Sequence, residues 1–321
     1  MVVTTRMTTV IVAESYGGPD VLAVVDESVR QPGPEEIRVV VKGVGVNPVD
    51  YKLYSGAYGS DPEQLPLHLG SEACGVVAAV GSDPQGPAGP IGVGDEVVLY
   101  RIAGAYAQEV VVPAACALAK PESMTFAQAA GLMLTGTTAI HALTVTSVSQ
   151  GDTVVIHGAS GGVGRMAVQI ARHRGARVIG TAGPSGHDAL RALGAEPVSY
   201  GSGLLERVRA MAPRGIDAAL DMVGTDEALD TSVALVSDRA RIVTIAGFVR
   251  GLELGIKVIG GAPGADPGTE IRSAARLELV ELANAGVIKV DVAATFALVD
   301  AAQAHRELAS GHVHGKIILL P

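Results

Sequence analysis

The sequence contains no tryptophan, and aromatic residues make up only 3% of its 321 residues. It has two cysteines, Cys74 and Cys116, which cannot build a disulfide framework or a zinc site of several thiolates. Hydrophobic residues still amount to 48% of the chain. A core of Val, Ala, Leu and Ile without aromatics is typical of a parallel sheet covered by helices on both faces.

Basic residues are also scarce, with 24 Lys and Arg against 33 Asp and Glu and a formal charge of −9. This balance argues against nucleic acid as a partner, because binding phosphates needs a basic face. The first residues lack the apolar segment and cleavage site of a secretory signal. The longest uncharged run, residues 126–151, is rich in Thr, Gly, Gln and Ser and is a poor membrane span. We therefore expect a cytoplasmic α/β protein with no membrane partner.

The hydrophobic pattern changes near residue 126. The first 125 residues predict short strands separated by Gly/Pro turns, as at 36–46 and 96–99. Beyond that point short apolar runs alternate with helical patterns, which predicts a Rossmann-type, doubly wound parallel sheet. The strands expected in this sheet are 154–157, 177–180, 218–221 and 241–245.

The strongest chemical signal is the segment VVIHGASGGVG, which ends at Gly164 and is followed by a helix and a second strand. A strand, a glycine turn and a helix in one unit form the context of a dinucleotide-binding fingerprint. Gly161 would let the backbone approach a pyrophosphate, Gly164 would let the helix pack closely, and the helix N-terminus would supply N–H groups. The first glycine of the fingerprint is replaced by Ala159. The residues expected to bind the cofactor here are Gly158, Ala159, Ser160, Gly161, Gly162, Val163 and Gly164.

The end of the second strand indicates which cofactor binds. An Asp or Glu there would bind the ribose 2′-hydroxyl and repel a 2′-phosphate. Residues 180–187 read GTAGPSGH, with no carboxylate until Asp188. Hydroxyl and basic side chains could hold the additional phosphate instead, so we predict NADPH as the cofactor. These side chains are Thr181, Ser185, His187 and Arg191.

Several further motifs keep a common order along the chain: GVGVNPVDYKLYSGAY, LGSEACGVVAAVG, GDEV, AAGLMLTGTTAIHAL, HGASGGVG and GKIILL. Together they resemble the medium-chain dehydrogenase/reductase superfamily, and within it the zinc-independent, zeta-crystallin-like quinone oxidoreductase branch. The resemblance implies a mainly β, GroES-like catalytic domain at residues 1–125 and 267–321. A Rossmann domain at 126–266 would be inserted into it. Members of this branch commonly form homodimers through edge strands, and 258–260 would be that strand here.

Zinc-dependent alcohol dehydrogenases of this superfamily carry a Cys within the segment that is 45–50 here and a His before the Glu of the next motif. This sequence has Asn47 and Ser71 at these places. An amide and a hydroxyl are poor replacements for thiolate and imidazole around zinc. The four-cysteine structural lobe is also absent, so we expect no metal.

Without a Lewis acid, hydride transfer must rely on positioning and on a proton or hydrogen-bond donor. In enoyl-thioester reductases of the superfamily a Tyr follows the Asn-Pro segment by eleven residues, and Tyr58 stands there. Tyr58 is thus a candidate proton donor or a loop aromatic that only lines the cleft, and Tyr54 and Tyr51 are weaker candidates. Asn47 would hold the nicotinamide ribose or the substrate oxygen.

The resemblance also suggests further cofactor contacts. Tyr200 would pack on the adenosine end, and Lys316 would either reach the cofactor or remain a solvated lysine at a strand start. The Lys that related enzymes place after the second strand is missing. The remaining expected contacts are Thr135, Asp221, Val223, Gly224, Ala246, Gly247 and Phe248.

These features predict an NADPH-dependent oxidoreductase that transfers hydride to quinones or activated carbonyl compounds. The rival hypothesis is an enone or enoyl-thioester reductase in which Tyr58 donates a proton. A third hypothesis, from another class, is a cofactor-binding protein with little turnover. The expected partner is a small-molecule substrate in each enzymatic case.

Overall fold

The computed structural model describes residues 6–311 and 313–321. The chain divides into two compact units. One, called the β-rich unit, comprises Met1–Leu134, Arg276–Gly286 and Val290–Pro321, and the other, called the parallel-sheet unit, comprises Thr135–Ala275 and Val287–Lys289. The sequence placed the changes at 125/126 and 266/267, whereas the second division lies within helix α9 (Thr269–Asn284).

The β-rich unit contains a seven-stranded sheet in which strands from both ends of the chain meet. Along the sheet the order is β10 (Ala117–Ala119), β8 (Glu96–Tyr100), β5 (Glu72–Val80), β3 (Glu36–Val46), β18 (Lys316–Leu320) and β17 (Val292–Ala297), and β9 (Glu109–Pro113) also pairs with β3. The antiparallel pairing of β18 with β3 sets Ile317 opposite Val46. This register brings Lys316 next to the segment that begins at Asn47.

A second sheet of the β-rich unit has the order β2 (Leu22–Val29), β1 (Arg6–Ala13) and β4 (Leu67–His68), and β6 (Gln85–Gly86) and β7 (Gly89–Pro90) form a small hairpin. Helices α1 (Pro48–Tyr54), α2 (Phe126–Ala130) and α10 (Ala301–Ala309) belong to the same unit. On β3 the side chains of Ile37, Val39 and Val41 are buried and alternate with more exposed neighbours, as expected for a strand with one face on the core.

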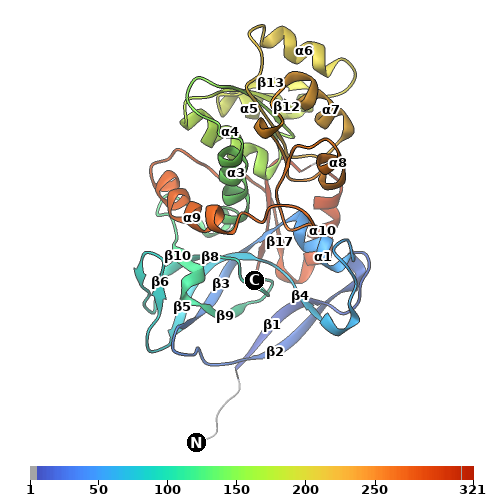
Figure 1. Ribbon diagram of the computed structural model, residues 1–321. Helices are drawn as coiled ribbons and strands as arrows, with labels where there is room; N and C mark the ends of the chain where they lie inside the picture. Colours follow the sequence, from blue (N-terminus) through green and yellow to red (C-terminus); the bar gives the residue numbers. More distant parts are fainter. Residues whose placement is uncertain (1–5, 312) are drawn as a thin grey trace, which may run out of the picture. The chain divides into compact units, whose positions relative to one another are not determined.

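The parallel-sheet unit holds six parallel strands, as the alternating sequence pattern predicted. Their order is β13 (Glu196–Ser199), β12 (Arg177–Ala182), β11 (Thr153–His157), β14 (Ala218–Asp221), β15 (Ile242–Thr244) and β16 (Lys257–Val258). In Figure 1, α4 (Gly162–His173) and α5 (His187–Ala192) are drawn to the left of these strands and α7 (Asp226–Leu235) and α8 (Phe248–Glu253) to their right. The predicted α/β class is confirmed.

The order in which the parallel strands are added reverses at β11: β12 and β13 lie on one side of it, and β14, β15 and β16 lie on the other. Ligands of open parallel sheets bind outside the carboxyl ends of the strands at such a switch point. A ligand would therefore contact the residues that follow β11, β12, β14 and β15. β16 lies at one edge of the sheet. It begins one residue before the predicted edge strand 258–260 and ends two residues before it.

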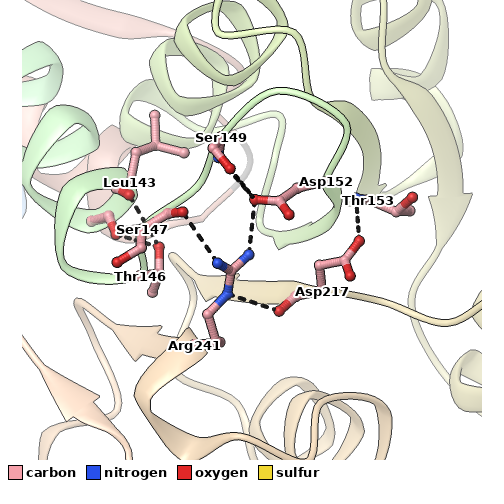
Figure 2. Close-up of polar contacts among 9 residues, drawn as sticks. Leu143, Thr146, Ser147, Ser149, Asp152, Thr153, Asp217 and Arg241 are labelled. Atoms are coloured by element: carbon pink, nitrogen blue, oxygen red, sulfur yellow. Dashed lines mark hydrogen bonds and ion pairs between the residues drawn. The ribbon is translucent and has the colours of Figure 1, made fainter.

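The opposite, amino-terminal edge of the sheet is tied together by Arg241, which precedes β15 (Figure 2). Its guanidinium donates to the carbonyl oxygens of Ser147 and Asp217, at 3.1 Å each, and to the Asp152 carboxylate at 2.8 Å. The Asp217 carboxylate in turn accepts from the Thr153 amide at 2.7 Å. These contacts join the amino-terminal ends of β11, β14 and β15. The carboxyl ends of the same strands lie on the opposite side of the sheet.

Helices α1 and α6 (Leu204–Met211) are absent from the sequence-based expectations, whereas a helix was expected to open in the LTGTTA segment, where α3 (Met133–Val145) lies. In α3 nearly every side chain is buried, so the helix shows no polar face by which a periodic pattern could be found. Within the described residues, no helix has the length and apolar character needed to cross a membrane.

Candidate active site

The glycine turn links the end of β11 to the start of α4. Gly158 has a φ of +67°, a left-handed conformation that favours glycine. A Cβ on Gly164 would lie 2.3 Å from the Gly158 carbonyl oxygen and 2.7 Å from the Ala159 Cα. Both neighbours are backbone atoms, so only glycine permits this close packing of helix on turn.

The N-terminus of α4 is open to a ligand. Gly161 is its N-cap, no side chain caps it, and its first turn contains no acidic residue. The first N–H groups of a helix have no intrahelical acceptor, and the helix dipole adds partial positive charge. A Cβ on Gly161 would meet only the Gly158 oxygen, at 3.4 Å, so the space above the turn is free. These features fit the pyrophosphate of a dinucleotide.

The carboxyl ends of β14 and β15 are shaped by a buried carboxylate. Asp221 accepts from the amides of Val223 and Gly224, at 3.1 and 2.9 Å, and from the Thr244 hydroxyl at 2.6 Å. Thr244 also accepts from the Gly247 amide at 2.9 Å. Burial raises the pKa of Asp221 above its usual range. Asp221 therefore holds two loops in place, and Thr244 is a member of this site that sequence reasoning missed.

Three further predicted cofactor residues belong to neighbouring elements of the same unit. Val223 follows β14 and is half exposed, Phe248 begins α8, and Thr135 is buried on α3. His157, the last residue of β11, is fully buried, and neither ring nitrogen has a partner among the described residues. Burial lowers the pKa of His157 to about 4, so its ring is neutral at physiological pH.

The residues predicted to hold the 2′-phosphate lie at the end of β12 and in the segment after it. Thr181 departs from that prediction, because it is buried and its hydroxyl accepts from the Gly158 amide at 3.2 Å. His187 lies 3.3 Å from the Ala182 carbonyl oxygen, and Arg191 pairs on the surface with Asp188 at 2.6 Å. Tyr200 is 63% exposed. Ser185 lies between β12 and His187, and Thr181 supports the glycine turn.

Tyr200 also lies beside the loop that leaves β12. A Cβ on Gly183 would be 3.5 Å from the Tyr200 hydroxyl. A large exposed aromatic ring of this kind offers a face on which a base can stack. The structure thus brings Tyr200, Ser185 and His187 to one corner of the parallel-sheet unit.

In the β-rich unit, Asn47 is the centre of a buried polar cluster and is only 1% exposed. Its amide group donates to the Gly45 carbonyl oxygen at 3.1 Å and to Glu72 Oε1 at 2.9 Å. Its Oδ1 accepts from Lys316 Nζ at 2.6 Å. Both N–H donors of the side chain are therefore in use. Asn47 was predicted to hold the nicotinamide ribose or the substrate oxygen, and in this geometry its side chain has no N–H left to donate to either.

Lys316 is buried as well, and its ammonium has three acceptors. Besides Asn47, it donates to Glu72 Oε1 and to the Val46 carbonyl oxygen, at 3.0 Å each. Neither suggestion for Lys316 agrees with this arrangement: the side chain is not solvated, and it has no remaining N–H for a cofactor. The other Glu72 oxygen accepts from the Leu134 amide at 2.8 Å, which ties α3 to the cluster.

The three candidate tyrosines have different surroundings. Tyr54 is 1% exposed and its hydroxyl lies 2.7 Å from His305 Nδ1, which leaves it no access to a substrate and departs from its prediction as a catalytic candidate. Tyr58 and Tyr51 are both partly buried. Burial and the neighbouring Tyr51 raise the pKa of Tyr58 above its usual range. Tyr58 and Tyr51 are the two of these tyrosines that are not fully enclosed.

Two family models match the chain. One, described as an alcohol dehydrogenase GroES-like domain, matches residues 33–122, and the other, described as a zinc-binding dehydrogenase, matches residues 193–319. The quinone oxidoreductase of Salmonella typhimurium is 36% identical to the chain, over 98% of it and 100% of its own length. This chain belongs to the quinone oxidoreductase branch of the medium-chain dehydrogenase/reductase superfamily.

Solved structures of this superfamily agree. Escherichia coli quinone oxidoreductase in complex with NADPH has a TM-score of 0.83 and 31% identity, covering 98% of this chain and 100% of its own. A mycobacterial protein in complex with NADPH has a TM-score of 0.82 and 32% identity, with coverage of 98% and 100%. The chain is an oxidoreductase of this superfamily, and its substrate is a small molecule.

The zinc in the name of one family model does not fit this chain. At the two ligand positions stand the Asn47 amide and the Ser71 hydroxyl, and an ammonium lies 2.6 Å from the Asn47 oxygen. Zinc sites use thiolate, imidazole or carboxylate ligands, and a neighbouring cation repels the metal. In the part of the chain that the structure describes, no group of three or more His, Cys, Asp or Glu could hold a metal ion.

Proposed function

We propose that this chain transfers hydride from NADPH to quinones or other activated carbonyl compounds, without a bound zinc ion. The observation that carries the proposal is the uncapped N-terminus of α4 above the Gly158–Gly164 turn, with no carboxylate in the loop after β12. Bound NADPH supplies the hydride. The helix N–H groups bind its pyrophosphate.

The remaining residues set cofactor choice. Ser185, His187 and Arg191 offer a hydroxyl and basic groups to a 2′-phosphate, and Tyr200 offers a face to the adenine. Asp188 is the first carboxylate after β12 in the sequence, and it pairs with Arg191 on the surface. A 2′-phosphate would compete for that arginine, so binding NADPH requires Arg191 to leave Asp188.

The assay that tests this function follows NADPH oxidation with a panel of quinones, enones, enals and enoyl thioesters. We expect turnover with quinones, and a kcat/KM at least ~10-fold lower with NADH, equivalent to about 1.4 kcal/mol. Activity should survive dialysis against a chelator, and elemental analysis should find no stoichiometric zinc. Comparable efficiency with NADH would contradict the cofactor assignment. NADPH binding without oxidation across the panel would favour a binding protein with little turnover.

The second candidate function is reduction of an enone or enoyl thioester, because Tyr58, unlike Tyr54, is only partly buried and its hydroxyl can serve as a proton donor. Reduction of such a substrate needs a proton on carbon, whereas reduced quinone oxygens take protons from water. Replacing Tyr58 with Phe removes only the hydroxyl. We expect quinone turnover to change by less than ~3-fold and enone turnover to fall by ~10²-fold, the usual contribution of a general acid.

The matched control is Tyr51→Phe, which removes a second partly buried hydroxyl from the same segment. It should leave both activities near wild type. Equal losses on quinones and enones in Tyr58→Phe would contradict the proton-donor role, and an enone rate far above the quinone rate in wild type would favour the second function.

A further inference from the structure

A chain of four buried polar side chains runs through the β-rich unit beside the Asn47 cluster. The Tyr54 hydroxyl lies 2.7 Å from His305 Nδ1, and His305 Nε2 lies 2.8 Å from the Tyr106 hydroxyl. Tyr106 donates to Asp50 Oδ2 at 3.1 Å. All four residues are at most 1% exposed. They come from α1, the loop before β9 and α10, and Tyr54 and His305 are 251 positions apart.

The hydrogen bonds of this chain have one consistent direction when Asp50 is ionised. An ionised carboxylate only accepts, so Tyr106 must donate to Asp50 and accept from His305 Nε2–H. A neutral imidazole has one donor and one acceptor nitrogen, so His305 Nδ1 must accept from Tyr54. Burial lowers the pKa of His305 to about 4, which keeps the ring neutral.

Asp50 is the member of this hydrogen-bonded row whose burial costs the most free energy. Its Oδ2 also accepts from the backbone N–H of Asn47 at 2.8 Å, whereas its Oδ1 is buried with no partner among the described residues. Burial raises the pKa of Asp50 to about 7, although Lys316 on β18 opposes the shift. Glu72 on β5 adds a small increase. A buried, half-satisfied carboxyl lowers stability, so its presence suggests a role other than packing.

These hydrogen-bonded side chains hold both ends of α1. Asp50 caps the first turn through the Asn47 amide, and Tyr54 is the last residue of the helix. The Tyr54 carbonyl oxygen accepts from the Gly17 amide at 2.9 Å. Beyond the helix, Asp61 exchanges two hydrogen bonds with the neighbouring Tyr16 hydroxyl, at 3.0 and 3.1 Å. The intervening segment 55–60 carries Tyr58, so it is held at both ends.

We infer that Asp50, Tyr106, His305 and Tyr54 form a positioning network that fixes α1 and, through it, sets the place of Tyr58. The inference rests on the proposed function for its kinetic consequence, because Tyr58 is the residue assigned to contact the substrate there. Tyr54 and His305 are thus positioning residues and not catalytic ones. A displacement of the donor by about 1 Å is enough to lower a rate ~10- to 100-fold.

The test that does not depend on activity uses 3-fluorotyrosine in place of the seven tyrosines. Fluorine NMR then gives one signal for each, and Tyr58→Phe identifies the signal of Tyr58. We expect Tyr54→Phe and His305→Phe to shift or broaden the Tyr58 signal. Tyr100→Phe, which removes a buried tyrosine hydroxyl on β8 outside the network, should leave it unchanged. An unchanged Tyr58 signal in both network variants overturns the inference.

The kinetic arm uses the substrate with the best turnover, at a temperature where each variant is fully folded. With an enone, Tyr54→Phe should lower kcat ~10-fold and change KM by less than ~2-fold. Added to Tyr58→Phe, it should cause no further loss, since both changes act through one hydroxyl. A Tyr54→Phe loss that persists undiminished in the Tyr58→Phe background overturns the inference. If wild type oxidises no NADPH, the proposed function fails, and the fluorine spectra still decide the positioning.

Discussion

Replacing Gly164 with alanine should raise the NADPH dissociation constant ~100-fold. The new Cβ would lie 2.3 Å from the Gly158 oxygen and 2.7 Å from the Ala159 Cα, and backbone atoms cannot rotate away. The turn and α4 must separate, which moves the N–H groups from the pyrophosphate. Overpacking of this kind costs about 1–3 kcal/mol, so the free energy of unfolding should fall too. NADPH fluorescence titration and urea denaturation measure the two effects.

Two other glycines provide controls. In Gly161→Ala the nearest atom to the new Cβ is the Gly158 oxygen at 3.4 Å, so folding should be unaffected while the methyl group fills the space above the turn. Its NADPH affinity should fall at unchanged stability. In Gly92→Ala, on the β-rich unit, the nearest atom is 3.8 Å away, and neither quantity should change. Wild-type affinity in Gly164→Ala would show that the cofactor binds elsewhere.

Replacing Lys316 with methionine should lower the free energy of unfolding by about 3–5 kcal/mol, the usual effect of breaking a buried ion pair. The side chains of Lys316 and Glu72 are 5% and 1% exposed. Without the ammonium, the buried Glu72 carboxylate loses its cationic partner and Asn47 Oδ1 loses its donor. Urea denaturation of the purified protein at neutral pH measures the loss.

The double variant Lys316→Met/Glu72→Gln also removes the carboxylate that is left without its cation, and it should recover a large part of the stability. Arg30→Met is the matched surface control, because Arg30 pairs with Glu36 while its own side chain is 60% exposed. Its loss should be no more than about 1 kcal/mol. If Lys316→Met were as stable as Arg30→Met, the buried pair would not hold the Asn47 segment.

The parallel-sheet unit was largely predictable, because its signals are local. Strands that are buried on both faces appear as short apolar runs, and 218–221 was predicted with the bounds that it has. The glycine turn combines a left-handed residue, a helix start and close packing within a few positions.

The β-rich unit was less predictable at its polar centre. The spacing of Asn47 and Asp50 is that of a capping box and could have revealed the start of α1. No local pattern could assign Glu72, Tyr106 and His305 to the same neighbourhood, because their partners lie far away in the sequence. Asn47 and Lys316 were accordingly predicted as cofactor contacts, although their donors are bound internally.

The sequence by itself determined the α/β class, the dinucleotide turn and the unsuitability of Asn47 and Ser71 for zinc. These depend on the hydrophobic period, on backbone freedom at a few glycines and on the chemistry of single side chains. Only the tertiary structure decided which polar groups are already satisfied. Pairing of β18 with β3 brings Lys316 to Asn47, 269 positions away, and packing of α10 brings His305 to Tyr54. A buried donor that has found its acceptor is no longer available to a ligand.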